Sequence, residues 1–196
     1  MLTTLITNKM KQNNKLLLLI LFFAIHSCKK EGTPNVALPA ITQNGQNTLG
    51  FNLDNKVWSN YGKRCTGLGG CKENKVSAYL YKELNGDFNL EISAGYNTKT
   101  IDQVFYISTK NIISTGTFNI DSSLNQHIAF FANQSAPFLQ QYKNRQPNKC
   151  FLTFTTFDTT NKIIAGVFNA TLYNSINLND SVKIENGRFD AKLDYK

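Results

Sequence analysis

The sequence predicts an all-β fold, either a single antiparallel β-sandwich or a small β-barrel, that follows a lipoprotein signal peptide. Aromatic and β-branched residues recur in short runs of alternating polarity rather than at helical spacing, which is typical of strands. Turn-forming pairs such as Asn85-Gly86 separate many of these runs. The chain has 196 residues, of which 41% are hydrophobic, and this suits one domain with one core.

A cleaved signal peptide is expected at residues 1–27. Residues Leu16–Ile25 form an unbroken apolar stretch. Three lysines precede it: Lys9, Lys11 and Lys15. A membrane-spanning helix needs about 20 apolar residues, so the shorter stretch is interpreted as the hydrophobic region of a signal peptide. The sequence leaves both Met1 and Met10 open as the translation start.

The residues that end this segment resemble a lipobox. Ile25-His26-Ser27-Cys28 has an apolar residue at −3, a small residue at −1 and a cysteine, whereas His26 at −2 fits loosely. We therefore expect Cys28 to become the new N-terminus and to carry lipid as a thioether. Two or more acyl chains hold a protein on a membrane durably.

The mature chain is divided into a tether and a domain. Residues 28–47 are predicted to be the lipidated cysteine and a polar, flexible tether, because they show no periodicity and contain several glycines and prolines. Residues 48–196 are predicted to be the all-β domain. Cleavage leaves 18 basic and 13 acidic residues, a net charge of +5. The basic residues are scattered, which argues against a nucleic-acid partner.

Two hairpins are predicted at the start of the domain. The first turns at Asp54-Asn55, since these residues tolerate the positive φ of a tight turn. The second joins Val76–Leu84 to Asp87–Ala94 through a two-residue type I′ turn at Asn85-Gly86.

The register of the second hairpin decides where two tyrosines lie. A two-residue turn pairs Tyr81 with Leu90 and Tyr79 with Ile92, on the face of Phe88, so both tyrosines are expected to face the core. The alternative is an exposed aromatic strip that stacks on sugars.

The remaining strands follow the same pattern. The runs are Ile101–Thr109, Gly116–Ile120, Ile128–Ala132, Cys150–Phe157, Lys162–Tyr173 and Ser181–Leu193. Turn residues are found at Asp158–Asn161, Asn174–Asp180 and Asn186-Gly187.

Two basic, loop-like segments with aromatic residues are the candidate ligand surface. They are Tyr61–Lys75 and Asn133–Lys149, and the second has room for a helical turn that begins at Ser135. If both lie at one end of the domain, an acidic or polar partner is expected to contact a shared set of side chains. The set is Lys63, Arg64, Tyr142, Lys143 and Arg145.

Three cysteines remain once Cys28 is lipidated, and the oxidising cell envelope favours one disulfide. The glycine-rich stretch between Cys65 and Cys71 lets the chain fold back, so this pair is predicted. The alternative joins Cys150 to either of them.

No catalytic constellation or metal site is recognised, and no cofactor is expected. His127 is the one histidine of the mature chain, so a multi-histidine metal site is excluded within a monomer. Cys150 with His127 could form a thiol nucleophile and its base, but Cys150 lies in an alternating run and is expected to be buried. The four aspartates Asp54, Asp87, Asp158 and Asp180 lie in predicted turns, where aspartate is common for backbone reasons.

Both ends of the mature chain resemble a known family. Leu38–Gly50, continuing through Asp54–Trp58, is similar to the start of a family of uncharacterised β-rich lipoproteins of Bacteroidetes-type bacteria. Thr160–Phe168 and Ile184–Asp190 resemble its last two strands. The chain departs from that family at two positions, Asn55 and Ala165. The resemblance implies a location in the envelope and a β-rich body, and it brings no activity.

These observations favour a non-enzymatic, lipid-anchored binding or scaffolding domain. We expect it at the outer membrane, facing either the periplasm or the cell surface, with the membrane as one partner through Cys28 and an envelope protein or a glycan as another. The alternative is a glycoside hydrolase that acts on envelope or other polysaccharide. A cleft with two carboxylates about 5 to 10 Å apart would favour that alternative.

Overall fold

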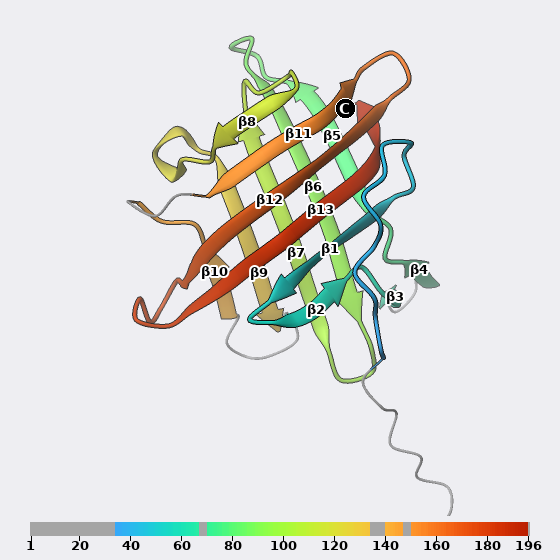
Figure 1. Cartoon of the computed structure of the whole chain (residues 1–196), viewed down its shortest axis with the longest axis vertical. Helices are drawn as coiled ribbons and strands as arrows, with labels where there is room; N and C mark the ends of the chain where they lie inside the picture. The colour runs from blue at the N-terminus through green and yellow to red at the C-terminus, as the bar shows by residue number, and fades with distance from the viewer. Residues whose placement is uncertain (1–33, 67–69, 134–139, 147–149, 196) are drawn as a thin grey trace, which may run out of the picture. The chain divides into compact units, whose positions relative to one another are not determined.

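The computed structural model describes residues 34–66, 70–133, 140–146 and 150–195 (Figure 1). The predicted signal peptide and Cys28 therefore lie outside the described residues. Within the described part, no helix has both the length and the apolar character needed to cross a membrane. Residues from Val36 onward form one compact unit.

The unit is built almost entirely from strands, which confirms the predicted all-β class. The strands are β1 (Thr48–Leu53), β2 (Lys56–Ser59), β3 (Lys63–Thr66), β4 (Gly70–Glu73), β5 (Ser77–Lys82), β6 (Phe88–Asn97), β7 (Asp102–Lys110), β8 (Gly116–Asn119), β9 (His127–Asn133), β10 (Gln140–Lys143), β11 (Phe151–Asp158), β12 (Ile163–Asn174) and β13 (Ser181–Tyr195). A 3₁₀ turn at Ser122–Leu124 interrupts the pattern between β8 and β9.

Eleven strands form one sheet in the order β2-β1-β13-β5-β6-β7-β9-β10-β12-β11-β8, and β3 pairs with β4 in a separate hairpin. Because β12 also pairs with β13, the sheet closes on itself. The strand pairings are antiparallel apart from β13 with β5, which is parallel over Leu193–Tyr195.

The closed sheet is folded into two layers. β2, β1, β13, β12, β11 and β8 form the front layer, and β5, β6, β7, β9 and β10 form the rear layer, whose strands cross behind it (Figure 1). The layers are joined where β13 meets β5 and where β12 meets β10. The fold thus combines the two alternatives left open by the sequence, a sandwich and a barrel.

Aromatic rings from both layers fill the space between them. Phe51 of β1 lies 4.7 Å from the ring of Trp58 and 4.7 Å from that of Phe105, which belongs to the rear layer. Phe105 stacks on Phe168 of β12 at 5.1 Å. Such contacts contribute about 0.5–1.5 kcal/mol each beyond area burial, so this cluster fixes how the layers meet.

The first predicted hairpin is confirmed. Leu53 pairs with Lys56 across Asp54 and Asn55, which have φ values of 46° and 67°. Positive φ at both central positions is the conformation of a type I′ turn.

The second predicted hairpin forms, but its register differs from the prediction by one residue. Lys82 pairs with Phe88, and Glu83 donates its N–H to the Asp87 carbonyl over 2.7 Å. The loop is therefore Leu84-Asn85-Gly86, a three-residue turn with φ +92° at Gly86.

The one-residue slip exchanges the two faces of β5. Ala78 and Leu80 point into the core with 0% and 5% exposure, whereas Tyr79 and Tyr81 are half-exposed on the outer side. The prediction that these tyrosines face the core is therefore wrong, and they belong to an outward aromatic strip.

The predicted tether is docked on the domain along most of its length. Residues 36–47, here called the strap, lie against β13 beside β1. Asp190, which is 1% exposed, accepts hydrogen bonds from the Thr42 hydroxyl and the Gly45 N–H, both at 2.7 Å. It also accepts the N–H groups of Asn44 and Gln46, each at 3.1 Å. The compact domain thus begins at residue 36 rather than 48.

Two further expectations need correction. Asn186-Gly187 is a bulge inside β13 rather than a turn, because the pairing with β12 shifts between Phe168 and Ala170. Within the predicted loop Asn133–Lys149, residues 140–143 form β10. Ser135, the expected start of a helical turn, lies outside the described residues.

Candidate binding face

The outer side of the rear layer presents a group of tyrosines around one carboxylate. Tyr79 of β5 pairs directly with Glu91 of β6. The Tyr81 hydroxyl donates to Glu91 Oε1 over 3.0 Å, and Tyr106 of β7 also hydrogen-bonds to Glu91. We call Tyr79, Tyr81, Tyr106 and Glu91 the tyrosine face.

The environment keeps the phenols of Tyr81 and Tyr106 protonated. Burial, followed by the hydrogen bond to Glu91, raises the pKa of Tyr81 and that of Tyr106 above the ordinary tyrosine value. Both hydroxyls therefore donate to the carboxylate at neutral pH, which fixes the orientation of the two rings.

Serine hydroxyls continue this surface. Ser77 of β5 pairs with Ser93 of β6, which in turn pairs with Tyr106. Ser108 lies on the other side of Glu91. Since the neighbouring residues on these strands point into the core, the four hydroxyl-bearing side chains and Glu91 share one polar outer surface.

His127 lies at the far margin of the same surface, where it pairs with Ser108. Burial, and then the positive charge of Lys143, lower the pKa of His127 below its ordinary value, so the ring is neutral at pH 7. Its Nδ1 is buried without a hydrogen-bond partner. The described residues contain no group of three side chains able to hold a metal ion.

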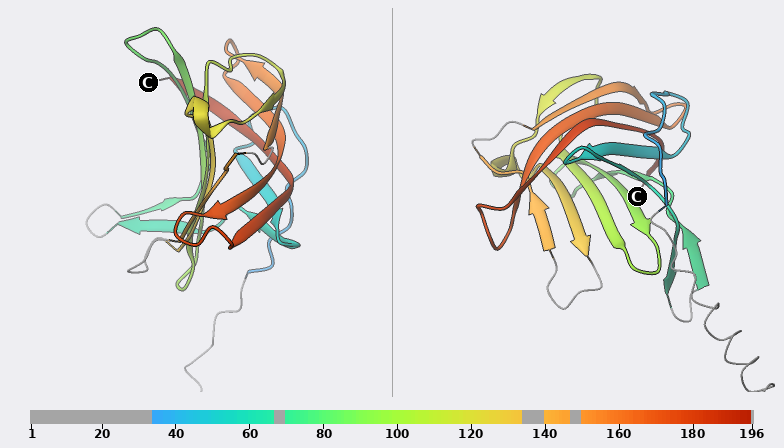
Figure 2. Two further views of the ribbon diagram at one scale, coloured as in Figure 1. Left: turned by 90° about the vertical axis from the view of Figure 1, so that its left-hand side faces the viewer. Right: turned by 60° about the horizontal axis from the view of Figure 1, so that its bottom comes forward.

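The β3–β4 hairpin flanks the opposite end of this surface. Tyr61, just before the hairpin, donates its N–H to the Gly95 carbonyl of β6 over 3.0 Å, and Asn97 N–H donates to the Tyr61 carbonyl over 3.0 Å. Figure 2 (left) shows the hairpin projecting from the rear layer on the side away from the front layer. It therefore forms a wall beside the outer side of β6.

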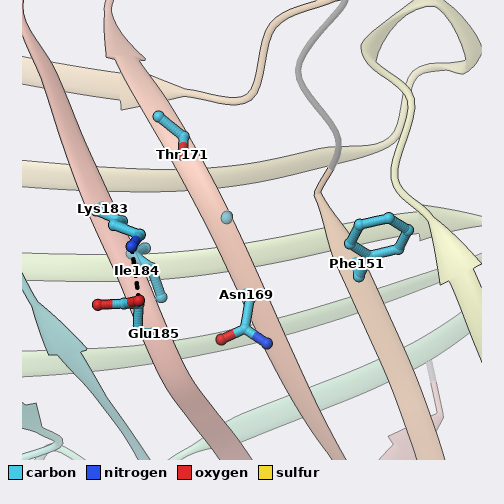
Figure 3. Close-up of a pocket in the computed structure, with 7 residues that line it drawn as sticks. Phe151, Asn169, Thr171, Lys183, Ile184 and Glu185 are labelled. Carbon is cyan, nitrogen blue, oxygen red and sulfur yellow. Dashed lines mark ion pairs between the residues drawn. The ribbon is translucent and has the colours of Figure 1, made fainter.

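A shallow hollow of about 150 Å³ lies on the other layer (Figure 3). Phe151, Asn169 and Thr171 line one side of it. On the other side Lys183 Nζ lies 2.7 Å from Glu185 Oε1, so the two charges neutralise each other. The hollow is below the roughly 300–1,000 Å³ of ordinary ligand pockets, and its charged groups are already paired.

The residues predicted to bind a partner are not gathered into one cluster. Lys63 is exposed on β3, and its ammonium lies 3.9 Å from the Glu73 carboxylate. Arg64 is the next residue of β3, and its side chain is not among those that the structure describes. Lys143 and Arg145 are exposed on and after β10. β3 lies against β6, and β10 is three strands further across the rear layer.

Tyr142 does not present its ring to a partner. The residue is 7% exposed, and its hydroxyl donates to Asp180 Oδ2 over 2.8 Å. It therefore joins β10 to the turn before β13. No local pattern around Tyr142 indicates this role, because Asp180 is 38 residues away along the chain.

The fold places Cys65 opposite Cys71 and keeps Cys150 apart from both. Cys65 of β3 lies opposite Cys71 of β4 in the antiparallel pair, a placement that suits the predicted disulfide, which stays a prediction. Cys150 is a free thiol with 0% exposure, and burial raises its pKa to about 11. It is therefore neither cross-linked to the hairpin nor ionised as a nucleophile at pH 7.

The aspartates predicted to lie in turns have structural partners there. Asp158 Oδ1 accepts the N–H groups of Thr160 and Asn161, at 2.9 Å and 2.8 Å. Asp87 accepts from Asn111 and lies 2.7 Å from Lys110 Nζ. Hydrogen bonds lower the pKa of both carboxyls, so they stabilise their turns as anions.

Comparison with known proteins gives no assignment: no family model, no curated protein and no solved structure matches this chain. The resemblance of both ends of the mature chain to envelope lipoproteins stays an expectation.

Proposed function

We propose that this chain is a lipid-anchored protein of the bacterial cell envelope whose β-domain binds glycans on its tyrosine face, without acting on them as an enzyme. Cys28 is the proposed attachment point, at the outer membrane. The observation that carries the proposal is the outward position of Tyr79, Tyr81 and Tyr106 around Glu91.

The chemistry of this surface suits sugars. A tyrosine ring offers an apolar face for the C–H groups of a sugar ring, and its hydroxyl offers a hydrogen bond. Glu91 and Asp194, which pairs with Tyr79 at the end of β13, supply acceptors for sugar hydroxyls, while Ser77 and Ser93 supply donors and acceptors. A sugar chain that uses these groups would lie on the outer face of the rear layer.

A protein ligand that adds a strand is less well suited to this layer. Such a ligand needs an open strand edge. The two outer strands of the rear layer are β5, which pairs with β13, and β10, which pairs with β12. These pairings cover Ala78–Leu80 of β5 and Tyr142-Lys143 of β10, so part of each edge is taken and the face is the larger continuous surface of this layer.

A glycoside hydrolase is the second candidate, and one observation favours it. The register places Asp194 next to Tyr79 and Tyr79 next to Glu91, so the two carboxylates are two strands apart. Adjacent strands lie about 4.8 Å apart, which gives roughly 10 Å between the backbones. This is near the separation used by inverting enzymes. However, Glu91 already accepts two phenolic hydrogen bonds, and Asp194 is exposed rather than held in a cleft.

The test compares three forms of the mature chain on an array of bacterial and plant glycans. Wild type is expected to retain a defined set of glycans, and the double variant Tyr79→Ala/Tyr81→Ala to bind them at least about tenfold more weakly, because each aromatic contact contributes about 1 kcal/mol. Phe151→Ala removes an exposed ring from the front layer and is the matched control.

Three outcomes decide between the candidates. Equal retention by all three forms would show that the tyrosine face is not the site, and no retention by wild type would end the glycan proposal. Release of reducing sugars that stops in Asp194→Asn would favour the hydrolase.

A further inference from the structure

The tyrosine face ends in a hollow of about 160 Å³ over Gly95. Its lining comes from β6, β7 and the segment after β4: Asn74, Lys75, Ser93, Asn97 and Val104. Gly95 lets the Asn74 amide lie directly against the strand, because a Cβ at residue 95 would lie 2.9 Å from Asn74 Oδ1. The volume is below that of a pocket for a whole drug-sized ligand and suits one part of a longer ligand.

The hollow lies in line with the tyrosines. Tyr81, Tyr79 and Ser77 alternate along the outer side of β5. Lys75 continues this alternation, since it is exposed while Val76 is 4% exposed and packs in the core. Alternate residues of a strand are about 6.7 Å apart, and Lys75 lies two residues before β5 begins, so it is at most roughly 13 Å from Tyr79 along the chain. An extended ligand on the tyrosines therefore reaches Lys75.

The two ends of this surface, the hollow and the tyrosines, differ in the charge of their side chains. Lys75 forms no ion pair with the described residues. The segment 61–75, which ends at Lys75, carries four basic residues, Lys63, Arg64, Lys72 and Lys75, against one acidic residue, Glu73. The other end holds the carboxylates of Glu91 and Asp194. Asp102 also lies beside the hollow, where the Asn97 amide donates to its Oδ1 over 2.6 Å. The attraction of an anion to the hollow therefore depends on Lys75.

We infer that the hollow over Gly95 is a subsite for an acidic sugar, with the sugar carboxylate on Lys75 and its hydroxyls on Asn74 Oδ1 and Ser93, while neutral sugars of the same chain lie on the tyrosines. The inference rests on the proposed glycan binding. A uronic acid combines the required groups, because it carries a carboxylate beside hydroxyl donors. A chain with an acid on every sugar is disfavoured by Glu91 and Asp194.

The experiment measures the affinity of the mature chain for three polymers by calorimetry: a neutral xylan, a xylan that bears glucuronate branches, and polygalacturonate. Wild type is expected to bind the glucuronate xylan most tightly. Lys75→Gln should weaken that binding about tenfold and leave the neutral xylan unchanged, since it removes one charge-assisted contact. Lys56→Gln, an exposed lysine on β2, is the matched control.

Gly95→Ala tests the shape of the subsite independently of its charge. The added methyl group displaces the Asn74 amide from its place over residue 95, and we expect the same selective loss for the glucuronate xylan, with a single cooperative unfolding transition showing that the variant is folded. If both variants bind all three polymers as wild type does, while Tyr79→Ala/Tyr81→Ala binds none, the acidic subsite is wrong and the glycan face stands. If wild type binds no polymer, both proposals are overturned.

Discussion

At the scale of single residues, Asp190 is buried although its side chain points away from the core. β13 points this carboxylate away from the core, and the strap covers it and donates four hydrogen bonds. Burial by itself would raise the pKa of Asp190, but these hydrogen bonds outweigh it and lower the pKa below its ordinary value of 3.8. The ionised carboxylate therefore holds the strap on the domain.

Asp190→Asn is predicted to lower the free energy of unfolding by about 2–4 kcal/mol at pH 7, because a buried amide replaces an anion among N–H donors. A lowered folded-state pKa stabilises the protein above the pKa of the unfolded chain, and this contribution is lost as the pH falls through the folded-state pKa. The difference between wild type and variant should therefore shrink below about pH 4.

Urea unfolding at pH 7 and at pH 3 measures both effects. Asp194→Asn, an exposed carboxylate four residues along the same strand, is the control and should leave stability within about 0.5 kcal/mol of wild type. An equal loss in the two variants would show that the strap hydrogen bonds are not the cause.

At the scale of elements, glycines mark where strands bend or turn, and they do so for different reasons. Gly187 lies in the bulge of β13, where a Cβ would meet the Phe168 ring at 2.5 Å and the Phe168 carbonyl oxygen at 2.6 Å. Gly86 lies in the turn between β5 and β6, with open space around its Cβ position but φ at +92°. Crowding requires the first glycine, and backbone conformation requires the second.

Gly187→Ala is predicted to destabilise the domain by about 1–3 kcal/mol or more, because the buried Phe168 ring and backbone must both move. Gly86→Ala is expected to cost about 1 kcal/mol, since only local backbone strain is added. Chemical denaturation of the two variants gives the comparison. A larger loss for Gly86→Ala would contradict the role assigned to the bulge.

At the scale of the whole molecule, docking of the strap shortens the link to the proposed anchor. Only residues 29–35 separate Cys28 from the compact unit that begins at Val36. Fully extended, they span at most roughly 25 Å. A lipidated Cys28 would therefore keep the domain near the headgroups.

Cys28→Ala tests the anchor directly. Wild type is predicted to partition into the detergent phase and to sediment with membranes, whereas the variant should be released or retain its signal peptide uncleaved. Phase separation and the mass of the mature N-terminus measure these outcomes. Cys150→Ala, which removes a buried thiol, is the control and should partition as wild type does. Identical partitioning of Cys28→Ala and wild type would contradict lipid attachment.

Local chemistry in the sequence was sufficient for the all-β class, for most strand positions and for the turn at Asp54-Asn55. These features depend on residues close together in the chain, since alternation and turn propensity act over a few positions. The same local reasoning correctly interpreted Asp87 and Asp158 as turn residues, and Cys150 as buried.

Tertiary structure alone decided which side of β5 faces the core and where the domain begins. Tyr79 and Tyr81 alternate with Ala78 and Leu80, and both pairs are apolar enough to be buried, so the pattern defines two faces without choosing the inner one. Packing of Ala78 and Leu80 against the rest of the core selects the inner face, and the three-residue turn between β5 and β6 accommodates the one-residue slip in register. Docking of the strap could not be predicted from the sequence either, because residues 42–46 have the composition of a polar linker. Their hydrogen-bond acceptor is Asp190, about 145 residues later in the chain.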